Sequence, residues 1–110
     1  MKTLALRPRD LDVLLGILRR FPSVRRAAVF GSRASARARR TSDLDLAISA
    51  PDATAAEWSD LMGALEEAPL IYELDLVRLE NTDNARLIGK IAREGVQIYP
   101  SVSQPEIRHA

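Results

Sequence analysis

The 110-residue chain contains no cysteine, which excludes disulfides, thiolate catalysis and cysteine-based zinc sites. Aromatic residues make up only 5% of it, and no apolar run approaches the roughly 20 residues that a membrane helix needs. The first residues, Met1–Leu4, lead into charged positions rather than into the apolar region of a secretory signal. We therefore expect a single domain with one core, located in the cytoplasm and without a membrane span.

Charge is divided unevenly along the chain, although the net charge is only +1. Residues 1–40 carry eleven Lys or Arg against two Asp, and residues 41–110 carry five against thirteen Asp or Glu. A basic half is typical of nucleic-acid-binding proteins, but Phe21 and Phe30 are the only aromatic residues in this one. The pattern favours a phosphate-rich small ligand between a basic loop and an acidic metal site, with no direct nucleic-acid binding.

Two predicted strands flank that basic loop. The first covers about residues 24–30 and stops at a Gly-Ser turn, and the second starts at Asp43. Because successive side chains of a strand point to opposite faces, Asp43 and Asp45 share one face while Leu44 and Leu46 share the other. Carboxylates about 6.5 Å apart along a strand can share one metal ion or bridge two. An isolated Gly-Ser is ordinarily a plain turn, but Asp is depleted in strands, so the combination indicates a functional site.

Three helices are predicted around these strands. Leucines at positions i, i+3, i+4 and i+7 predict a core-facing helix over about residues 8–20. The sequence Thr54-x-x-Glu57 is a capping box that opens a second helix. A third helix is expected over about residues 82–94, followed by a short strand at Val96–Tyr99. We expect a domain over residues 1–100 and a flexible tail over 101–110.

A third acidic position stands inside a predicted third strand, Ile71–Arg78. Alternation places Glu73, Asp75 and Val77 on one face and the neighbouring apolar side chains on the other. A mid-strand charge needs a partner. A structural interpretation pairs Asp75 with Arg78 or with a loop arginine, and a functional one makes it a third metal ligand.

In their order and spacing, these features resemble the minimal nucleotidyltransferases, the MNT domain group of the DNA polymerase β superfamily. The resemblance covers about residues 10–99 and rests on Phe30-Gly31-Ser32-Arg33, on Ser42-Asp43-Leu44-Asp45-Leu46 and on Leu74-Asp75-Leu76-Val77. It implies an α/β (α+β) fold of the polymerase β type, with a small mixed sheet and helices packed mainly on one face. The chain departs from the family at Ser35 and Ala36, where Arg-Gly is frequent. The missing glycine narrows the conformations of the loop and the missing arginine removes one phosphate contact, so we expect less efficient nucleotide binding.

The resemblance also implies an activity, the transfer of AMP from ATP to a hydroxyl acceptor with two Mg²⁺ ions. It implies catalytic and metal-binding roles for Asp43, Asp45 and Asp75, and nucleotide binding by Gly31, Ser32 and Arg33. The implied partner is a small all-helical protein, most simply a HEPN-type toxin that is modified on a tyrosine, which makes this chain an antitoxin. Two alternatives stay open: transfer to a small molecule with a separate substrate-binding subunit, and a non-catalytic antitoxin that acts by binding.

Overall fold

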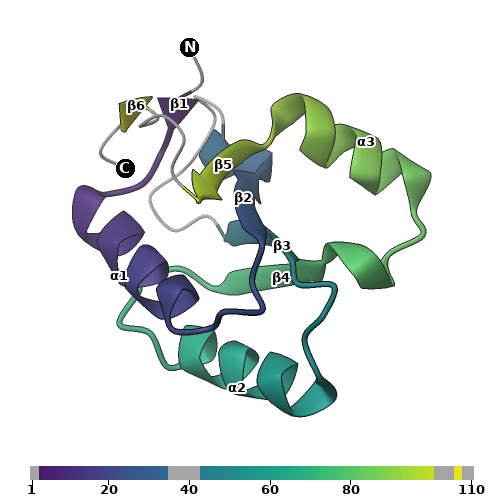
Figure 1. Cartoon of the computed structure of the whole chain (residues 1–110). Coiled ribbons are helices and arrows are strands. Elements are labelled where there is room, and N and C mark those ends of the chain that lie inside the picture. Colours follow the sequence, from purple (N-terminus) through teal and green to yellow (C-terminus); the bar gives the residue numbers. More distant parts are fainter. Residues whose placement is uncertain (1–2, 35–42, 101–105, 108–110) are drawn as a thin grey trace.

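The computed structural model describes residues 3–34, 43–100 and 106–107, which form a central four-stranded sheet with helices on both sides (Figure 1). The strand order is β4-β3-β2-β5. The central strands β2 and β3 are antiparallel, β5 is antiparallel to β2, and β4 is parallel to β3, so the sheet is mixed as predicted. The strands are β2 (Arg26–Phe30), β3 (Leu44–Ser49), β4 (Leu74–Arg78) and β5 (Val96–Tyr99).

The helices begin where local chemistry satisfies their first amide groups. Helix α1 (Pro8–Arg19) starts with a proline, which needs no partner for a missing N–H. Helix α2 (Ala55–Glu66) starts at the predicted capping box, in which Thr54 Oγ1 accepts from the amide of Glu57 at 3.1 Å. Helix α3 (Ala85–Glu94) is capped by Asn84, whose side-chain oxygen accepts from the amides of Arg86 and Leu87. It therefore begins later than the predicted residue 82.

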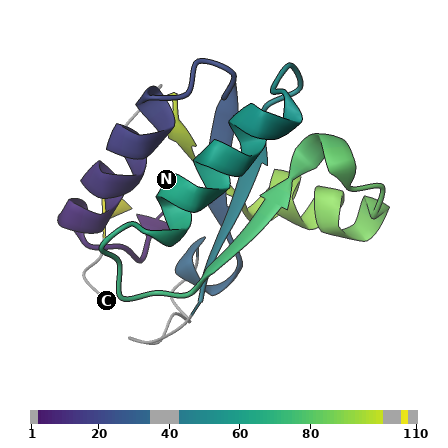
Figure 2. The ribbon, with the colours of Figure 1, turned by 90° about the horizontal axis from the view of Figure 1, so that it is seen from below.

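The main core lies between the sheet and the pair α1 and α2, which run side by side over one face (Figure 2). Leucines of α1 at the predicted stripe are buried, as are Leu61 and Leu65 of α2. On the sheet, alternate residues Leu44, Leu46 and Ile48 are fully buried against them. The prediction that helices pack mainly on one face is confirmed, because two of the three lie here.

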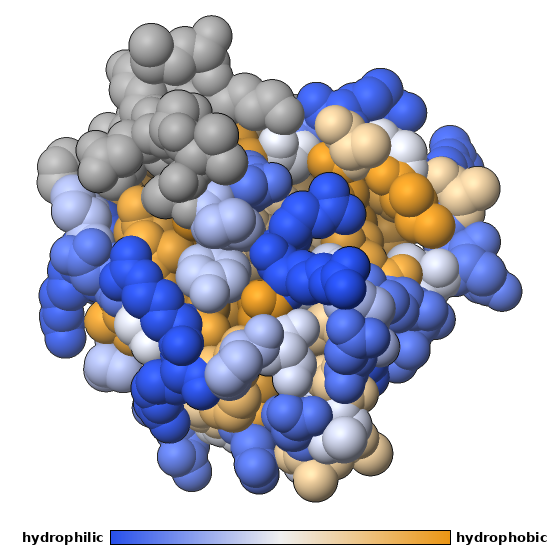
Figure 3. All heavy atoms as spheres, viewed as in Figure 1, coloured by the Kyte–Doolittle hydropathy of each residue, from blue (hydrophilic) through white to orange (hydrophobic). Residues whose placement is uncertain are grey.

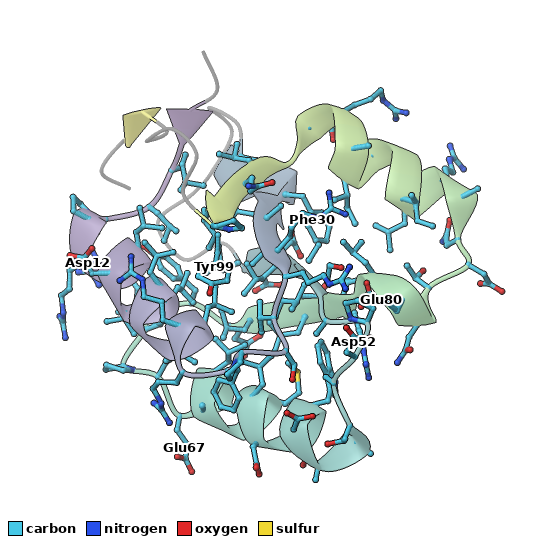
Figure 4. All side chains as sticks on the ribbon, viewed as in Figure 1. Asp12, Phe30, Asp52, Glu67, Glu80 and Tyr99 are labelled. Carbon is cyan, nitrogen blue, oxygen red and sulfur yellow. The ribbon has the colours of Figure 1, made fainter. Side chains whose placement is uncertain are left out.

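The opposite face of the sheet carries helix α3 and a smaller cluster. Phe30, Ala47 and Ile91 are buried there, with Val77, Leu79 and Leu87 packed around them. Figure 4 shows Phe30 between β2 and α3. Because this cluster is small, α3 covers only part of the face, and acidic side chains of the same face stay within reach of solvent.

A buried aspartate that the sequence did not single out links the start of α1 to the segment before β4, through an ion pair with Arg7 and a hydrogen bond from Tyr72. Asp10 has no exposed surface. It accepts from Arg7 Nε at 2.8 Å and from the hydroxyl of Tyr72 at 2.9 Å. Burial alone would raise the pKa of Asp10, but hydrogen bonds from Arg7 and Tyr72 together with the Arg7 charge outweigh it and leave that pKa below its ordinary value.

A second, two-stranded sheet pairs the ends of the described chain. Strand β1 (Thr3–Leu4) runs parallel to β6 (Glu106–Ile107). The rest of the predicted tail, residues 101–105 and 108–110, lies outside the described residues. None of the helices in the described ranges is long and apolar enough to cross a membrane.

Candidate active site

Two aspartates that lie 30 positions apart in the sequence are neighbours in the sheet. The parallel register of β3 and β4 places Asp45 opposite Asp75, and neighbouring strands lie about 4.8 Å apart. The antiparallel register of β2 and β3 places Phe30 on the other side of Asp45. Asp43 comes directly before β3 and is exposed, and its charge acts on Asp45. The structure therefore makes Asp45 and Asp75 neighbours and leaves Asp43 near them at the start of β3.

The Gly-Ser turn lies directly against this carboxylate pair. Gly31 begins a short 3-10 helix, η1 (Gly31–Ala34). Its φ is 72°, a left-handed backbone conformation that residues with a side chain rarely adopt. A Cβ atom at this position would overlap Oδ2 of Asp45 and would lie 3.2 Å from its Cγ. Both the backbone angle and the contact thus require glycine. Because Gly31 has no side chain, the backbone of the turn can lie directly against the Asp45 carboxylate.

Electrostatics at the site disfavour the charged form of Asp45. Burial raises its pKa most, and the adjacent Asp75 raises it further, by charge repulsion and by a hydrogen bond that needs one shared proton. The charge of Asp43 acts in the same direction, and the charge of Lys90 on α3 opposes them. A half-buried carboxylate among like charges is an arrangement that a cation would stabilise.

The carboxylates of this site are possible ligands for Mg²⁺. Within the described ranges, no three acidic or histidine side chains converge on one point as a complete metal cage. Magnesium seldom needs such a cage, because it is usually held by one or two carboxylates together with waters and substrate phosphates. Asp45 and Asp75 supply two hard oxygen donors side by side, and Asp43 supplies a third on the same face. This donor set fits Mg²⁺ bound together with a phosphate ligand.

The structural interpretation of Asp75 fails for one of its two candidate partners. Arg78 lies on the opposite face of β4, where it donates to the carbonyl oxygens of Ala50 and Ala53 at 2.8 and 3.1 Å. Its guanidinium carbon also stands 4.8 Å above the ring of Trp58, a cation–π contact. Arg78 therefore holds the β3–α2 connection rather than neutralising Asp75. The other candidate partners, Arg37, Arg39 and Arg40 of the loop, lie outside the described residues.

Some predicted site residues cannot be placed in this geometry. The side chains of Ser32 and Arg33 and the departures at Ser35 and Ala36 fall outside the part of the chain that the structure describes. One neighbour of the carboxylates, Lys90, was not predicted from the sequence. A sequence signal existed: Arg86, Lys90 and Arg93 are spaced as one stripe of a helix. Only the packing of α3 brings the charge of Lys90 near Asp45.

The fold is shared with a known family and with solved structures. The family described as "Polymerase beta, Nucleotidyltransferase" matches residues 13–104. A crystal structure of a toxin–antitoxin complex with AMP-PNP has 25% identity and a TM-score of 0.67, over 82% of this chain and 73% of that one. No curated protein matches.

Two further solved structures show the same fold at lower identity. One is the MntA–HepT toxin–antitoxin complex, with 23% identity, a TM-score of 0.56 and coverage of 84% of this chain and 72% of that one. The other is the tri-AMPylated HEPN toxin of Shewanella oneidensis in complex with its MNT antitoxin, with 22% identity, a TM-score of 0.57 and coverage of 86% and 72%. In each case the similar chain is the MNT antitoxin.

Proposed function

This chain belongs to the polymerase β nucleotidyltransferase family, and we propose that it transfers AMP from ATP to a hydroxyl group on a small helical HEPN-type toxin, for which it is the antitoxin. The observation that carries the proposal is the contact of three elements. Asp45 and Asp75 stand side by side on parallel strands, and the left-handed Gly31 lies directly on the Asp45 carboxylate. The turn that we assign to phosphate binding and the aspartate pair that we assign to metal binding thus lie in direct contact.

The reaction needs the acceptor oxygen, the α-phosphorus and the leaving oxygen in line. The acceptor hydroxyl forms a bond to the α-phosphorus while the bond from that phosphorus to the bridging oxygen of pyrophosphate breaks. The proton of the hydroxyl goes to a base, and we assign this role to the carboxylate of Asp75, which is exposed where an acceptor can reach it. Pyrophosphate leaves with the electron pair of the broken bond, so atoms and charges balance.

We assign nucleotide binding to the turn and to the aspartate pair. We assign the β- and γ-phosphates to the turn at Gly31, where the lack of a side chain lets a ligand approach the backbone. We assign Ser32 and Arg33 to the same phosphates. Asp43, Asp45 and Asp75 would hold Mg²⁺, which in this chemistry stabilises the charge that develops on the attacking and leaving oxygens. Asp75 is exposed and Asp45 is half-buried. We therefore place the acceptor at Asp75 and the nucleotide at Asp45.

The partner is proposed from the similar structures. In one of them a HEPN toxin is AMPylated in complex with its MNT antitoxin, and in another the toxin–antitoxin complex holds AMP-PNP. We propose the same partner class for this chain, because its fold matches these two complexes over 86% and 82% of its residues. A tyrosine hydroxyl is the acceptor that we expect on the toxin.

The test is transfer of labelled AMP from ATP to a co-expressed HEPN partner, followed by mass mapping of the modified residue. We expect labelling by the wild-type chain and a loss of orders of magnitude in Asp75→Asn, because the amide cannot accept the proton. ATP affinity should stay nearly intact in this variant, since Asp43 and Asp45 remain. Asp60→Asn, the same change on the exposed surface of α2, is the matched control and should label normally.

Two outcomes would replace the proposal by an alternative. If wild-type protein leaves the partner unlabelled while Asp75→Asn still neutralises it, the chain acts by binding alone. If ATP is consumed only when a small hydroxylated compound is added, the acceptor is a small molecule.

A further inference from the structure

Strand β4 carries Asp75 but has little apolar packing of its own. It is an edge strand, and within the described chain it pairs only with β3. None of its five residues is buried, whereas five of the six residues of β3 are. Figure 3 shows apolar surface gathered over α3 instead, at the upper right of the view. Because parallel pairing is also slightly weaker than antiparallel pairing, other contacts must help to fix the position of β4.

The register of β4 decides which side chain lies beside Asp45. In the observed register that side chain is Asp75. Glu73 and Val77 share the face of Asp75, so a shift of two residues, about 6.5 Å along the strand, would bring a longer carboxylate or an apolar side chain to the same place. Such a shift keeps the same face of β4 towards the core, so burial disfavours it only weakly.

Glu80, two residues beyond β4, binds the end of β3 through both of its carboxylate oxygens. Oε2 accepts from the hydroxyl of Ser49 at 2.7 Å, and Oε1 accepts from the amide of Ala50 at 2.8 Å. Ser49 is the last residue of β3 and is 6% exposed. Figure 4 shows Glu80 beside the connection from β3 to α2, in which Asp52 is labelled. Hydrogen bonds to a charged acceptor are about twice as strong as those between neutral groups.

Arg78, the last residue of β4, binds the same segment from its carbonyl side. Its Nη2 donates to the carbonyl oxygens of Ala50 and Ala53. The backbone of Ala50 is therefore bonded at its N–H by Glu80 and at its C=O by Arg78. A shift of β4 by even one residue, about 3.3 Å, exceeds the tolerance of a hydrogen bond and would break both contacts.

We propose that Glu80 is a positioning residue of the reaction, which fixes the register of β4 against β3 and so holds Asp75 beside Asp45. The inference rests on the proposed function and deepens it by naming the contact that sets the place of the acceptor base. Glu80 stands five positions beyond Asp75 in the chain, so it acts through the strand and not on the reacting atoms. A displacement of the base by about 1 Å can lower the rate about 100-fold.

Glu80 could instead contribute to stability alone. The start of β4 has an anchor of its own, since the Tyr72 hydroxyl donates to the buried Asp10 at 2.9 Å. Loss of Glu80 should therefore loosen the end of β4 without detaching the strand. A residue that contributes only stability changes the melting temperature, but not the rate of the folded protein well below that temperature.

The experiment measures AMP transfer to the co-expressed HEPN partner, ATP affinity with Mg²⁺ and amide hydrogen exchange in β4, all well below the melting temperature. Glu80→Ala should lower the transfer rate at saturating ATP at least about tenfold and change the ATP affinity less than about twofold. Its amides in β4 should exchange faster than those of the wild type. Glu80→Gln should keep most of the rate, because its carbonyl oxygen can accept from Ala50 and its NH₂ group can donate to the Ser49 oxygen.

Glu57→Ala is the matched control. Glu57 also accepts from one serine hydroxyl, that of Ser23 at 2.9 Å, and from one backbone amide, that of Thr54 at 2.9 Å. These contacts lie at the start of α2 and do not involve β4. The control should lower the melting temperature and leave the transfer rate and the exchange in β4 as in the wild type.

A disulfide can replace the contact of Glu80, because the chain has no cysteine of its own. Ala47 and Val77 are opposite one another in the register of β3 and β4, and neighbouring strands lie within the Cα spacing that a disulfide bridges. In the Glu80→Ala protein, Ala47→Cys together with Val77→Cys should restore the transfer rate when oxidised and not when reduced. The same pair in the wild-type protein should transfer AMP in both states.

Several results would overturn the inference alone while wild-type labelling upholds the proposed function. They are an unchanged rate in Glu80→Ala, an equal loss of rate in Glu57→Ala, and a disulfide that leaves the wild type active but does not restore Glu80→Ala. A wild-type protein that labels no partner would instead remove the proposed function. Hydrogen exchange in β4 then decides on the contact by itself: faster exchange in Glu80→Ala than in Glu57→Ala supports it, and equal exchange refutes it.

Discussion

Replacing Gly31 by alanine is the sharpest test of how the turn and the metal-binding pair depend on one another. The substitution adds one methyl group at a residue whose φ is 72° and whose Cβ position overlaps Oδ2 of Asp45. Two separate costs follow. The backbone must hold alanine in the left-handed region, and the Asp45 carboxylate must move or the turn must shift.

The first cost can be estimated from general values. A left-handed conformation costs a non-glycine residue about 1–2 kcal/mol, and in a domain of this size that lowers the melting temperature by about 4–8 °C per kcal/mol. The second cost falls on function. Displacing the carboxylate by even about 1 Å disturbs the alignment of the reacting atoms, an error that can lower the rate about 100-fold. We therefore expect moderately lower stability and nearly complete loss of AMP transfer.

The assay combines thermal melting, Mg²⁺-dependent ATP binding and AMP transfer for Gly31→Ala and for a control. Gly16→Ala is the control, because Gly16 is exposed on α1 and an added Cβ meets nothing within 4 Å. It should stabilise the protein by about 0.5–1 kcal/mol, since alanine favours helix over glycine. Destabilisation by Gly31→Ala and stabilisation by Gly16→Ala would show that the effect depends on the position of the glycine and not on the loss of a glycine as such.

A double-mutant cycle separates the two costs. In an Asp45→Ala background the carboxylate is gone, so Gly31→Ala should retain only the backbone cost and destabilise less than in the wild type. Equal destabilisation in both backgrounds would refute the contact between Gly31 and Asp45. Unchanged melting and unchanged ATP binding in the single Gly31→Ala variant would refute the whole argument.

Two further predictions concern charge. The raised pKa of Asp45, caused by burial and then by Asp75, means that its ionisation destabilises the free protein; this cost is absent below the ordinary value of 3.8 and grows as pH rises through the folded-state pKa. Asp45→Asn should thus melt higher than wild type at neutral pH and lose this advantage in acid, and identical melting curves at neutral pH would contradict it. Asp10→Ala should cost about 1–3 kcal/mol in urea unfolding, because it leaves the buried Tyr72 hydroxyl without its acceptor. The lowered pKa of Asp10 stabilises the fold above 3.8, and this contribution is lost as pH falls through its folded-state pKa. A cost below about 1 kcal/mol for Asp10→Ala would mean that the triad contributes little.

Local rules were enough for most of the secondary structure. The leucine stripe, the capping box at Thr54 and the alternation around Asp45 each depend on residues a few positions apart, and each predicted element appears in the structure. Boundaries moved where a side chain closer to the element made a better cap. Asn84 starts α3, later than the predicted residue 82, and β4 begins at Leu74, later than the predicted Ile71.

Short-range pattern also determined which face Asp43, Asp45 and Asp75 occupy, because alternation along a strand depends on nothing else. It could not determine which strands are neighbours. The parallel pairing of β3 with β4 makes Asp45 and Asp75 adjacent, and the sides of the sheet taken by Arg78 and by α3 decide which charges surround them. Those choices depend on packing between residues tens of positions apart. For that reason the contact of Gly31 with Asp45 and the hydrogen bond of Tyr72 to Asp10 were decided only by the tertiary structure.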